Sequence, residues 1–427
     1  MIRFIYNLLW PLGLLLFLPG YLVKMFRRGG YREKFGQRLG IYDLALVRKL
    51  VRQRTTWIHA VSVGEVAIAL KLARQLRALE PDLACVLTTT TTTGFSFACK
   101  NAAPWIEVMY MPLDFWPIMR RAFSVIRPGR IVLVEAEVWP NLVARARCSG
   151  VPIALVNARL SPRSERRFLR FRHLVGPMFK QLDLIGVPEH EDVERWVALG
   201  ADRARIRHTG SIKYDPIEHA TSLQPSASLL FSATDLVLFG GSTHRGEEEV
   251  LARIFLRLRP VFPALRLFIA PRHVERVREI RRELENLGLT AQLVSEANQN
   301  SAARTDCVLL DKTGELQSWY GVATVAFVGK SLIAHGGQNP VEPIAAGVPV
   351  VFGPHMENFA ILARELINQN AAIEATDVAA LERVMKDLLG DAEARRCLVS
   401  NATRVLSNHR GATERTAHLI ATLRPVP

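Results

Sequence analysis

The chain has 427 residues, 49% of them hydrophobic, which is enough apolar material to form two or three domain cores. Lysine and arginine outnumber aspartate and glutamate by 55 to 40, and the formal net charge of +15 indicates nucleic acid, an anionic membrane or a phosphorylated substrate as partner. The five cysteines are scattered and form no Cys-x-x-Cys or Cys/His cluster, which argues against a disulfide framework and a structural zinc site.

The first element along the chain is an apolar segment. No residue from Phe4 to Val23 is charged, and Arg27 and Arg28 follow directly. The segment is long enough to cross a bilayer, although its prolines and glycines weaken it as a helix. We therefore expect residues 1–28 to attach the protein to a membrane, as a spanning anchor or an interfacial hairpin. The basic residues that follow predict that the body lies on the cytoplasmic side.

Short apolar runs then alternate with helical patterns. Continuous apolar strands separated by helices are typical of a parallel sheet that is covered on both faces. The expected helices include Glu65–Ala78 and Glu189–Ala198. The expected strands are Thr56–Val61, Ala84–Thr89, Arg130–Val134, Pro152–Val156, Leu182–Val187 and Arg205–Thr209.

A stretch rich in proline and serine interrupts this pattern, and we assign residues 215–235 to a linker. The pattern then restarts, with helices at Gly246–Leu258 and Val274–Leu287. The sequence thus predicts two doubly wound α/β domains, 29–214 and 236–427, with a ligand crevice at the carboxyl ends of their strands. The expected strands of the second domain are Leu236–Phe239, Leu265–Ile269, Cys307–Leu310, Thr324–Val328 and Val348–Phe352.

Charged residues follow three strands of the first domain. Glu65 lies at the start of the helix after the first strand, where it could cap that helix or take a proton from an attacking hydroxyl. Glu135 and Glu137 follow the strand that ends at Val134. Such a pair could bind a metal, share a proton or cap the next helix, and we favour a structural or electrostatic role. Lys213 ends the domain and could neutralise a phosphate or a carboxylate.

The most informative segment of the second domain runs from Phe327 to His355. It predicts a buried strand, a glycine-rich turn, a short helix that opens at Asn339-Pro340, and another strand. Glycines let a ligand approach the backbone, and a helix start can favour an anion. Glu342 could accept hydrogen bonds from hydroxyl groups, so the segment suits a nucleotide-sugar, although it could also be a tight strand–helix junction. Further glycine-rich or basic turns follow other strands, at Gly240–Glu247, Ala270–His273 and Asp311–Glu315.

Taken in order, these motifs resemble those of the 3-deoxy-D-manno-octulosonic acid (Kdo) transferases of Gram-negative lipopolysaccharide synthesis. The resemblance covers nearly the whole chain and rests on His59-Ala-Val-Ser-Val-Gly-Glu65, Glu135-Ala-Glu-Val-Trp-Pro-Asn-Leu142, Asn157-Ala-Arg-Leu-Ser161, Thr209-Gly-Ser-Ile-Lys213, Ser242-Thr-His-Arg-Gly-Glu-Glu248, Pro271-Arg-His273 and Gly336-Gly-Gln-Asn-Pro-Val-Glu342. It implies the two-domain GT-B glycosyltransferase fold, CMP-Kdo as donor and a lipid A precursor as acceptor. It also implies a place at the cytoplasmic face of the bacterial inner membrane.

The resemblance also implies roles for single residues. Glu65 resembles the general base of an inverting displacement, and Glu135 and Lys213 resemble residues that stabilise the transition state. The positions that match the family's CMP-binding residues are Pro271, Arg272, Thr313, Gly314, Glu315, Asn339, Pro340, Val341 and Glu342. The sequence departs from the family's pattern at Gln338, usually His, and at Lys330, often Gly, and both lie in the donor loop.

Two alternatives follow from the residues. A GT-B lipid glycosyltransferase with a UDP-sugar donor is the nearest, because one fold hosts many donors. A basic nucleic-acid-binding protein is the other, but the chain has no recognisable RNA- or DNA-binding motif, so we expect no nucleic acid partner. A donor with a single phosphate needs less cationic help than a diphosphate, and no Asp-x-Asp motif occurs. We therefore expect neither a metal nor another cofactor.

Overall fold

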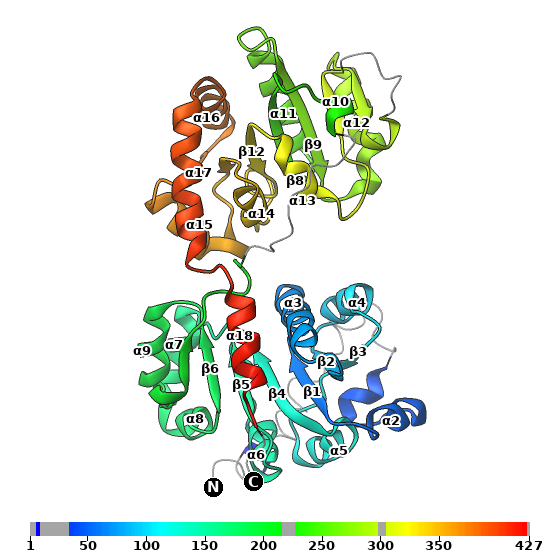
Figure 1. Cartoon of the computed structure of the whole chain (residues 1–427), viewed down its shortest axis with the longest axis vertical. Coiled ribbons are helices and arrows are strands. Elements are labelled where there is room, and N and C mark those ends of the chain that lie inside the picture. Colours follow the sequence, from blue (N-terminus) through cyan, green and yellow to red (C-terminus); the bar gives the residue numbers. More distant parts are fainter. Residues whose placement is uncertain (1–5, 9–33, 216–226, 298–304, 425–427) are drawn as a thin grey trace. The chain divides into compact units, whose positions relative to one another are not determined.

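A computed structural model describes residues 6–8, 34–215, 227–297 and 305–424. The chain forms two compact units, one made of Met1–Asp215 and His409–Pro427 and the other of Pro216–Asn408. Each unit contains a seven-stranded parallel sheet with helices packed on it (Figure 1). The expected membrane segment, residues 1–28, lies outside the described residues apart from 6–8. Within the part of the chain that is described, no helix combines the length and the apolar character needed to span a bilayer.

The sheet of the first unit has the order β3-β2-β1-β4-β5-β6-β7. Its strands are β1 (Thr55–His59), β2 (Cys85–Thr89), β3 (Ile106–Tyr110), β4 (Pro128–Val134), β5 (Ile153–Val156), β6 (Leu184–Val187) and β7 (Ile206–His208). Its helices are η1 (Phe35–Leu39), α2 (Leu44–Leu50), α3 (Val63–Leu79), α4 (Thr92–Asn101), α5 (Trp116–Ile126), α6 (Pro140–Cys148), α7 (Pro162–Arg170), α8 (Arg172–Phe179), α9 (His190–Ala198), η2 (Arg203–Arg205) and α18 (Ala412–Ala421).

Both faces of this sheet are buried. Successive residues of a strand point to opposite faces, and Trp57 and Ile58 of β1 accordingly belong to two separate cores. Both side chains are fully buried. Because both faces are covered, β1 and β2 are buried throughout, and their buried polar side chains are hydrogen-bonded, as His59 is to Thr88 at 3.1 Å.

The sheet of the second unit has the order β10-β11-β9-β8-β12-β13-β14. Its strands are β8 (Leu236–Thr243), β9 (Leu265–Pro271), β10 (Ala291–Leu293), β11 (Cys307–Leu309), β12 (Val325–Val328), β13 (Val350–Phe352) and β14 (Ile373–Glu374). Its helices are α10 (Ala227–Leu230), α11 (Glu247–Leu258), η3 (Val274–Arg276), α12 (Val277–Asn286), η4 (Val294–Glu296), α13 (Leu316–Trp319), η5 (Tyr320–Val322), α14 (Val341–Ala345), η6 (Glu357–Phe359), α15 (Ala360–Asn368), α16 (Val378–Gly390) and α17 (Ala392–Ser407).

The two predicted parallel sheets are confirmed, and every strand expected from an apolar run is present within a few residues. Three strands were not expected: β3, β10 and β14. All three are edge strands of their sheets. An edge strand pairs on one side only and needs fewer apolar residues, and β10 and β14 are only three and two residues long. They therefore lack the continuous apolar run that marked the inner strands.

The structure differs from the expected second domain, 236–427, at its carboxyl end. Helix α18 packs on α3 of the first unit, where Ala417 and Ile420 are fully buried in its core. Figure 1 shows α18, in red, beside the β1–β7 sheet. The buried carboxylate of Asp215 accepts hydrogen bonds from the backbone N–H groups of Gly411 and Thr413, both at 2.8 Å. A capped helix start and an apolar stripe thus join the last helix to the first unit.

We predict that Asp215→Ala lowers the free energy of unfolding by about 2–3 kcal/mol, because it leaves buried N–H groups at the start of α18 unpaired and removes the partner of Lys71, whose Nζ lies 3.6 Å from Asp215. Asp377→Ala is the matched control, since Asp377 is an exposed cap that accepts one bond from Ala380, and it should cost about 1 kcal/mol. Urea denaturation measures both, and equal costs would contradict the role of Asp215.

Candidate active site

Glu65 lies in the first turn of α3, directly after β1. Its Oε2 accepts a hydrogen bond from the N–H of Val61 at 2.9 Å, and its Oε1 accepts from the N–H and the hydroxyl of Ser62 at 3.2 and 2.8 Å. The side chain of Ser62 in turn accepts from the N–H of Glu65, so the two residues form a capping box. A carboxylate has about four lone-pair sites, so three bonds leave one site on Oε2 for another donor. Capping therefore orients this carboxylate and leaves one of its lone-pair sites available to another donor.

Glu135 follows β4 in a left-handed backbone conformation, with φ of 63°. Non-glycine residues in this region cost of order 1–3 kcal/mol and occur where the surrounding structure imposes them. Here the N–H of Glu135 continues the sheet by donating to the carbonyl of Val156 at 3.0 Å. Burial raises the pKa of Glu135, and the negative charge of Glu65 raises it further, while Lys213 and Arg159 oppose the shift. Glu135 thus lies within the electrostatic field of three charged side chains.

Lys213 and Arg159 supply the positive charge of this group. Burial lowers the pKa of Lys213, Glu135 opposes that shift, and Arg159 adds to it. Arg159 also donates a hydrogen bond to the hydroxyl of Tyr214 at 3.3 Å. Lys213 was expected in this site, whereas Arg159 belonged to a motif without an assigned role. Because arginines are numerous in this chain, its place beside Glu135 could be found only from the structure.

Asn157 holds the turn that carries Lys213. It follows β5, also with a positive φ of 50°, and its Oδ1 accepts from the hydroxyl of Ser211 and from the N–H of Ile212, both at 3.2 Å. Both contacts are buried, so one side chain links the end of β5 to the segment after β7. The polar group at this edge of the sheet is therefore held by backbone contacts on several strands.

Glu137 is the second acidic residue after β4. Burial raises its pKa to about 7, Glu65 and Glu135 raise it as well, and a hydrogen bond with Trp139 lowers it. The sequence analysis favoured a structural or electrostatic role for this pair, and the structure places Glu137 in the field of two other carboxylates. A carboxyl group with a pKa near 7 can both donate and accept a proton at neutral pH.

The expected donor-binding residues of the second unit follow three strands. Pro271 ends β9 and Arg272 comes next, Thr313–Glu315 follow β11, and Asn339–Glu342 follow β12. The strands are parallel, so all three segments lie at the same edge of the sheet. Burial raises the pKa of Glu342, and the hydrogen bond from Asn339 and the positive charge of Arg272 partly offset that rise. The structure therefore brings the first and third segments within electrostatic reach of each other.

Asn339 fixes the start of α14. Its Oδ1 accepts from the N–H of Val341 at 3.1 Å, and its amide donates to Oε1 of Glu342 at 3.0 Å. Two left-handed glycines precede it, and a Cβ at Gly337 would lie 2.5 Å from the sulfur of Met356. The glycine-rich turn is therefore a packing requirement at this position. Helix α14 has five residues, as expected for a short helix at this point.

The glycine-rich turn at Gly240–Glu247 is of a kind that can contact an anion. Its own Glu247, fully buried, is an anion that the backbone around it binds. That carboxylate accepts the N–H groups of His244 at 2.9 Å, Lys330 at 2.8 Å, Ser331 at 3.1 Å and Leu332 at 3.2 Å. The contact joins the start of α11 to the loop after β12, and so it anchors the donor loop.

Two parallel doubly wound sheets with charged residues at their carboxyl edges make up the GT-B fold. A UDP-GlcNAc 2-epimerase of Neisseria meningitidis shares the fold, with a TM-score of 0.55 and 9% identity over 87% of this chain and 100% of its own. A glycosyltransferase of Rickettsia africae does so with a TM-score of 0.52 and 11% identity over 86% of this chain and 97% of its own.

A family profile described as 3-deoxy-D-manno-octulosonic-acid transferase (kdotransferase) matches residues 33–216. The 3-deoxy-D-manno-octulosonic acid transferase of Haemophilus influenzae is 33% identical over 91% of each chain. That of Bordetella pertussis is 34% identical over 84% of this chain and 85% of its own. The chain belongs to the Kdo transferase family, and it is a glycosyltransferase that transfers Kdo in lipopolysaccharide biosynthesis.

We predict that Glu137→Gln stabilises the protein more at pH 8 than at pH 5. A carboxyl group whose pKa is raised to about 7 in the folded state favours the unfolded state once the pH passes its unfolded value of 4.5, and this penalty is complete above pH 7. With an allowance for solvent screening, the difference between variant and native protein should grow by about 1–2 kcal/mol from pH 5 to pH 8.

Urea denaturation at the two pH values measures this difference. Glu191→Gln, at an exposed position of α9, is the control and should show no such growth. A pH-independent difference for Glu137→Gln would contradict the raised pKa of Glu137.

Proposed function

We propose that this enzyme moves Kdo from CMP-Kdo to a hydroxyl of a lipid A precursor, lipid IVA, with inversion at the anomeric carbon and with Glu65 as the general base. The observation that carries the proposal is the geometry of Glu65. The residue is 8% exposed, and its carboxylate is held by three hydrogen bonds that leave one lone-pair site on Oε2. An acceptor hydroxyl that donates to this site gives up its proton as its oxygen attacks the sugar.

The field around Glu65 supports this role. Glu135 lies close enough for the charge of Glu65 to raise its pKa, and Lys213 and Arg159 balance the negative charge. We assign to Lys213 and Arg159 the neutralisation of charge on the donor, which carries a carboxylate and a phosphate. Glu135, with its imposed backbone conformation, keeps these cations in place when no substrate is bound. The charges of Lys213 and Arg159 are then oriented before the reaction begins, and they stabilise the transition state.

The second unit supports a donor with one phosphate. The segments that match the family's CMP-binding positions contain one arginine, Arg272, together with the carboxylates of Glu315 and Glu342. A diphosphate would need more positive charge to offset those two carboxylates. The amide of Asn339 and the carboxylate of Glu342 offer hydrogen-bonding groups to a ribose or a base.

We predict that Glu65→Gln lowers kcat by about 10²–10⁴-fold, because an amide cannot take the proton of the acceptor. The assay incubates the full chain with CMP-Kdo and a tetra-acylated lipid A precursor and measures the lipid product by mass spectrometry. Glu191→Gln, exposed on α9, is the matched control and should keep full activity.

The effect of Glu65→Gln on folding must be distinguished from its effect on catalysis, because the amide also disturbs the capping box. Ser62→Ala removes the hydroxyl that bonds to Oε1 of Glu65 but leaves the carboxylate. It should lower stability and retain most of the turnover. A folded Glu65→Gln protein with turnover within about tenfold of native would refute the role of Glu65.

We also propose that α7 and α8 lie against the cytoplasmic face of the inner membrane, beside the attachment by residues 1–28. Three large apolar side chains are exposed there, Leu169 at 42%, Phe171 at 48% and Leu174 at 51%. Five arginines of the same two helices are exposed as well, namely Arg163, Arg166, Arg167, Arg170 and Arg172. Apolar side chains interleaved with basic ones suit an anionic lipid surface, which also presents the acceptor.

We predict that the triple variant L169E/F171E/L174E binds vesicles containing anionic lipid about tenfold or more weakly, since it removes apolar burial and adds three like charges. Val261→Glu, at an exposed apolar residue of the other unit, is the control and should bind as the native chain does. Sedimentation with vesicles measures the bound fraction. Unchanged binding of the triple variant would contradict the proposed membrane face.

A further inference from the structure

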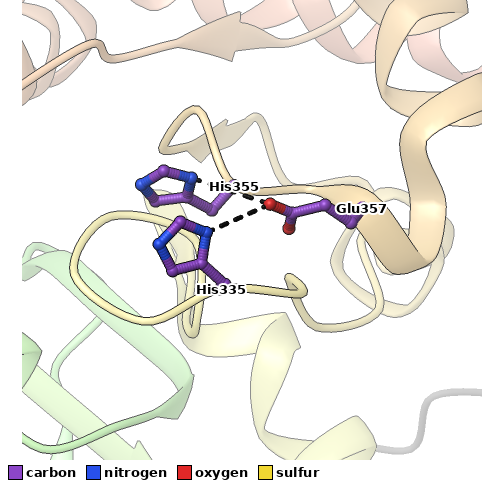
Figure 2. A group of neighbouring side chains, drawn as sticks. All are labelled: His335, His355 and Glu357. Atoms are coloured by element: carbon purple, nitrogen blue, oxygen red, sulfur yellow. Dashed lines mark hydrogen bonds and ion pairs between the residues drawn. The ribbon is translucent and has the colours of Figure 1, made fainter.

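Two histidines and a glutamate lie close together on the second unit, outside the residues assigned to the reaction. Nδ1 of His335 lies 3.2 Å from Oε1 of Glu357, and Nδ1 of His355 lies 3.7 Å from the same oxygen. The two imidazole rings are tilted by 42° to each other, with 3.8 Å between their centroids. Figure 2 shows both rings with a nitrogen directed at the carboxylate. One ligand atom from each residue lies within 4.8 Å of the other two.

Backbone contacts hold the two segments that carry this group. The N–H of His355 donates to the carbonyl of Ser331 at 2.9 Å, and the N–H of Asn358 donates to the carbonyl of Gly336 at 2.8 Å. The N–H of Gly336 donates to Oε2 of Glu357 at 2.7 Å. Glu357 therefore has one oxygen bound to the backbone and the other directed at the histidines. This arrangement orients the carboxylate before any ligand arrives.

We propose that His335, His355 and Glu357 bind a divalent transition-metal ion of the Zn²⁺ type. Imidazole nitrogen and carboxylate oxygen are ligands that suit Zn²⁺, and a set of two histidines and one carboxylate is a known zinc ligand set. Three protein ligands leave a coordination position open to water or to a ligand anion. The backbone N–H on Oε2 of Glu357 takes the part of an outer-shell partner that orients the carboxylate.

A cluster held by hydrogen bonds alone explains these residues less well. Elsewhere in the chain, His273 pairs with Glu275 and His418 with Glu414, and each of these pairs has a single imidazole. Within the described ranges, only His335, His355 and Glu357 offer three such ligands to one point. The side chains of His335 and Glu357 are also well exposed, at 71% and 56%, so an ion can reach them. Local sequence could not reveal the group, because its members are 20 residues apart.

Because the three residues lie in two different loops, a bound ion would affect both loops. His335 lies in the loop after β12 that continues to Asn339, and His355 and Glu357 lie in the loop after β13. A metal bound to all three would link the two loops by coordination bonds. It would thereby stiffen the segment that we assign to the donor, a consequence that rests on the proposed function. The proposed binding of the metal itself does not depend on that function.

Zinc binding to the untagged full chain tests the proposal directly. After removal of metals with a chelator, equilibrium dialysis against Zn²⁺ should load a single tight site per chain, and Co²⁺ in its place should give the visible absorption of a low-coordinate site. His335→Ala, His355→Ala and Glu357→Gln should each weaken binding by at least the ~10–100-fold that the loss of even an outer-shell partner costs. His418→Ala is the control for loss of an exposed histidine and should bind zinc as the native chain does.

Hydrogen exchange supplies a second measurement. Zinc should slow exchange in residues 331–340 and 353–358 of the native chain and leave exchange in the His335→Ala variant unchanged. Glu65→Gln should bind zinc with native affinity, so failure of the metal site and failure of the proposed base are distinguishable. Zinc that binds equally well to His335→Ala and His355→Ala, or a native chain that binds none, would overturn the proposal.

Discussion

Buried carboxylates that accept hydrogen bonds from backbone N–H groups hold the loops at the carboxyl ends of the strands in both sheets. Glu247 accepts four such bonds and fixes the loop after β12. Asp114 accepts the N–H groups of Asn141 and Leu142 at 2.9 and 2.8 Å and so fixes the start of α6. Glu65 and Asp215 act in the same way in the first unit. A buried carboxylate is costly without partners, so each of these contacts restricts its loop to one conformation.

Glu65 shows how such a constraint serves chemistry. The same bonds that cap α3 orient its carboxylate, and in the mechanism that we propose the acceptor hydroxyl donates to the lone-pair site that remains. Around it, Glu135 keeps a left-handed backbone that is costly for a glutamate. Strain of this kind persists where the neighbouring structure imposes it, and here the bond from Glu135 to Val156 does so. The charged group is therefore preorganised by the strands on either side of it.

The sequence predicted the inner strands well, because burial on both faces demands continuous apolar runs. It also placed Glu65, Glu135 and Lys213 in the segments that follow strands of the first sheet, where the structure has them. It missed three of the four edge strands, β3, β10 and β14, which pair with a neighbour on one side only. It could not identify Arg159 as a partner of Glu135, or the contacts of Glu247 with the loop after β12. These contacts join residues far apart in the chain, and no local pattern encodes them.

The return of α18 to the first unit has a consequence for how the protein is made. Ala417 and Ile420 complete the core on the α3 face of the first sheet, and Arg130 of β4 donates to the carbonyl of Ile420 at 3.4 Å. During synthesis on the ribosome, that face remains uncovered until α18, residues 412–421, has emerged. The second unit, whose residues are continuous, can fold earlier. The first unit, although most of it is translated first, thus completes its core after the second unit can fold.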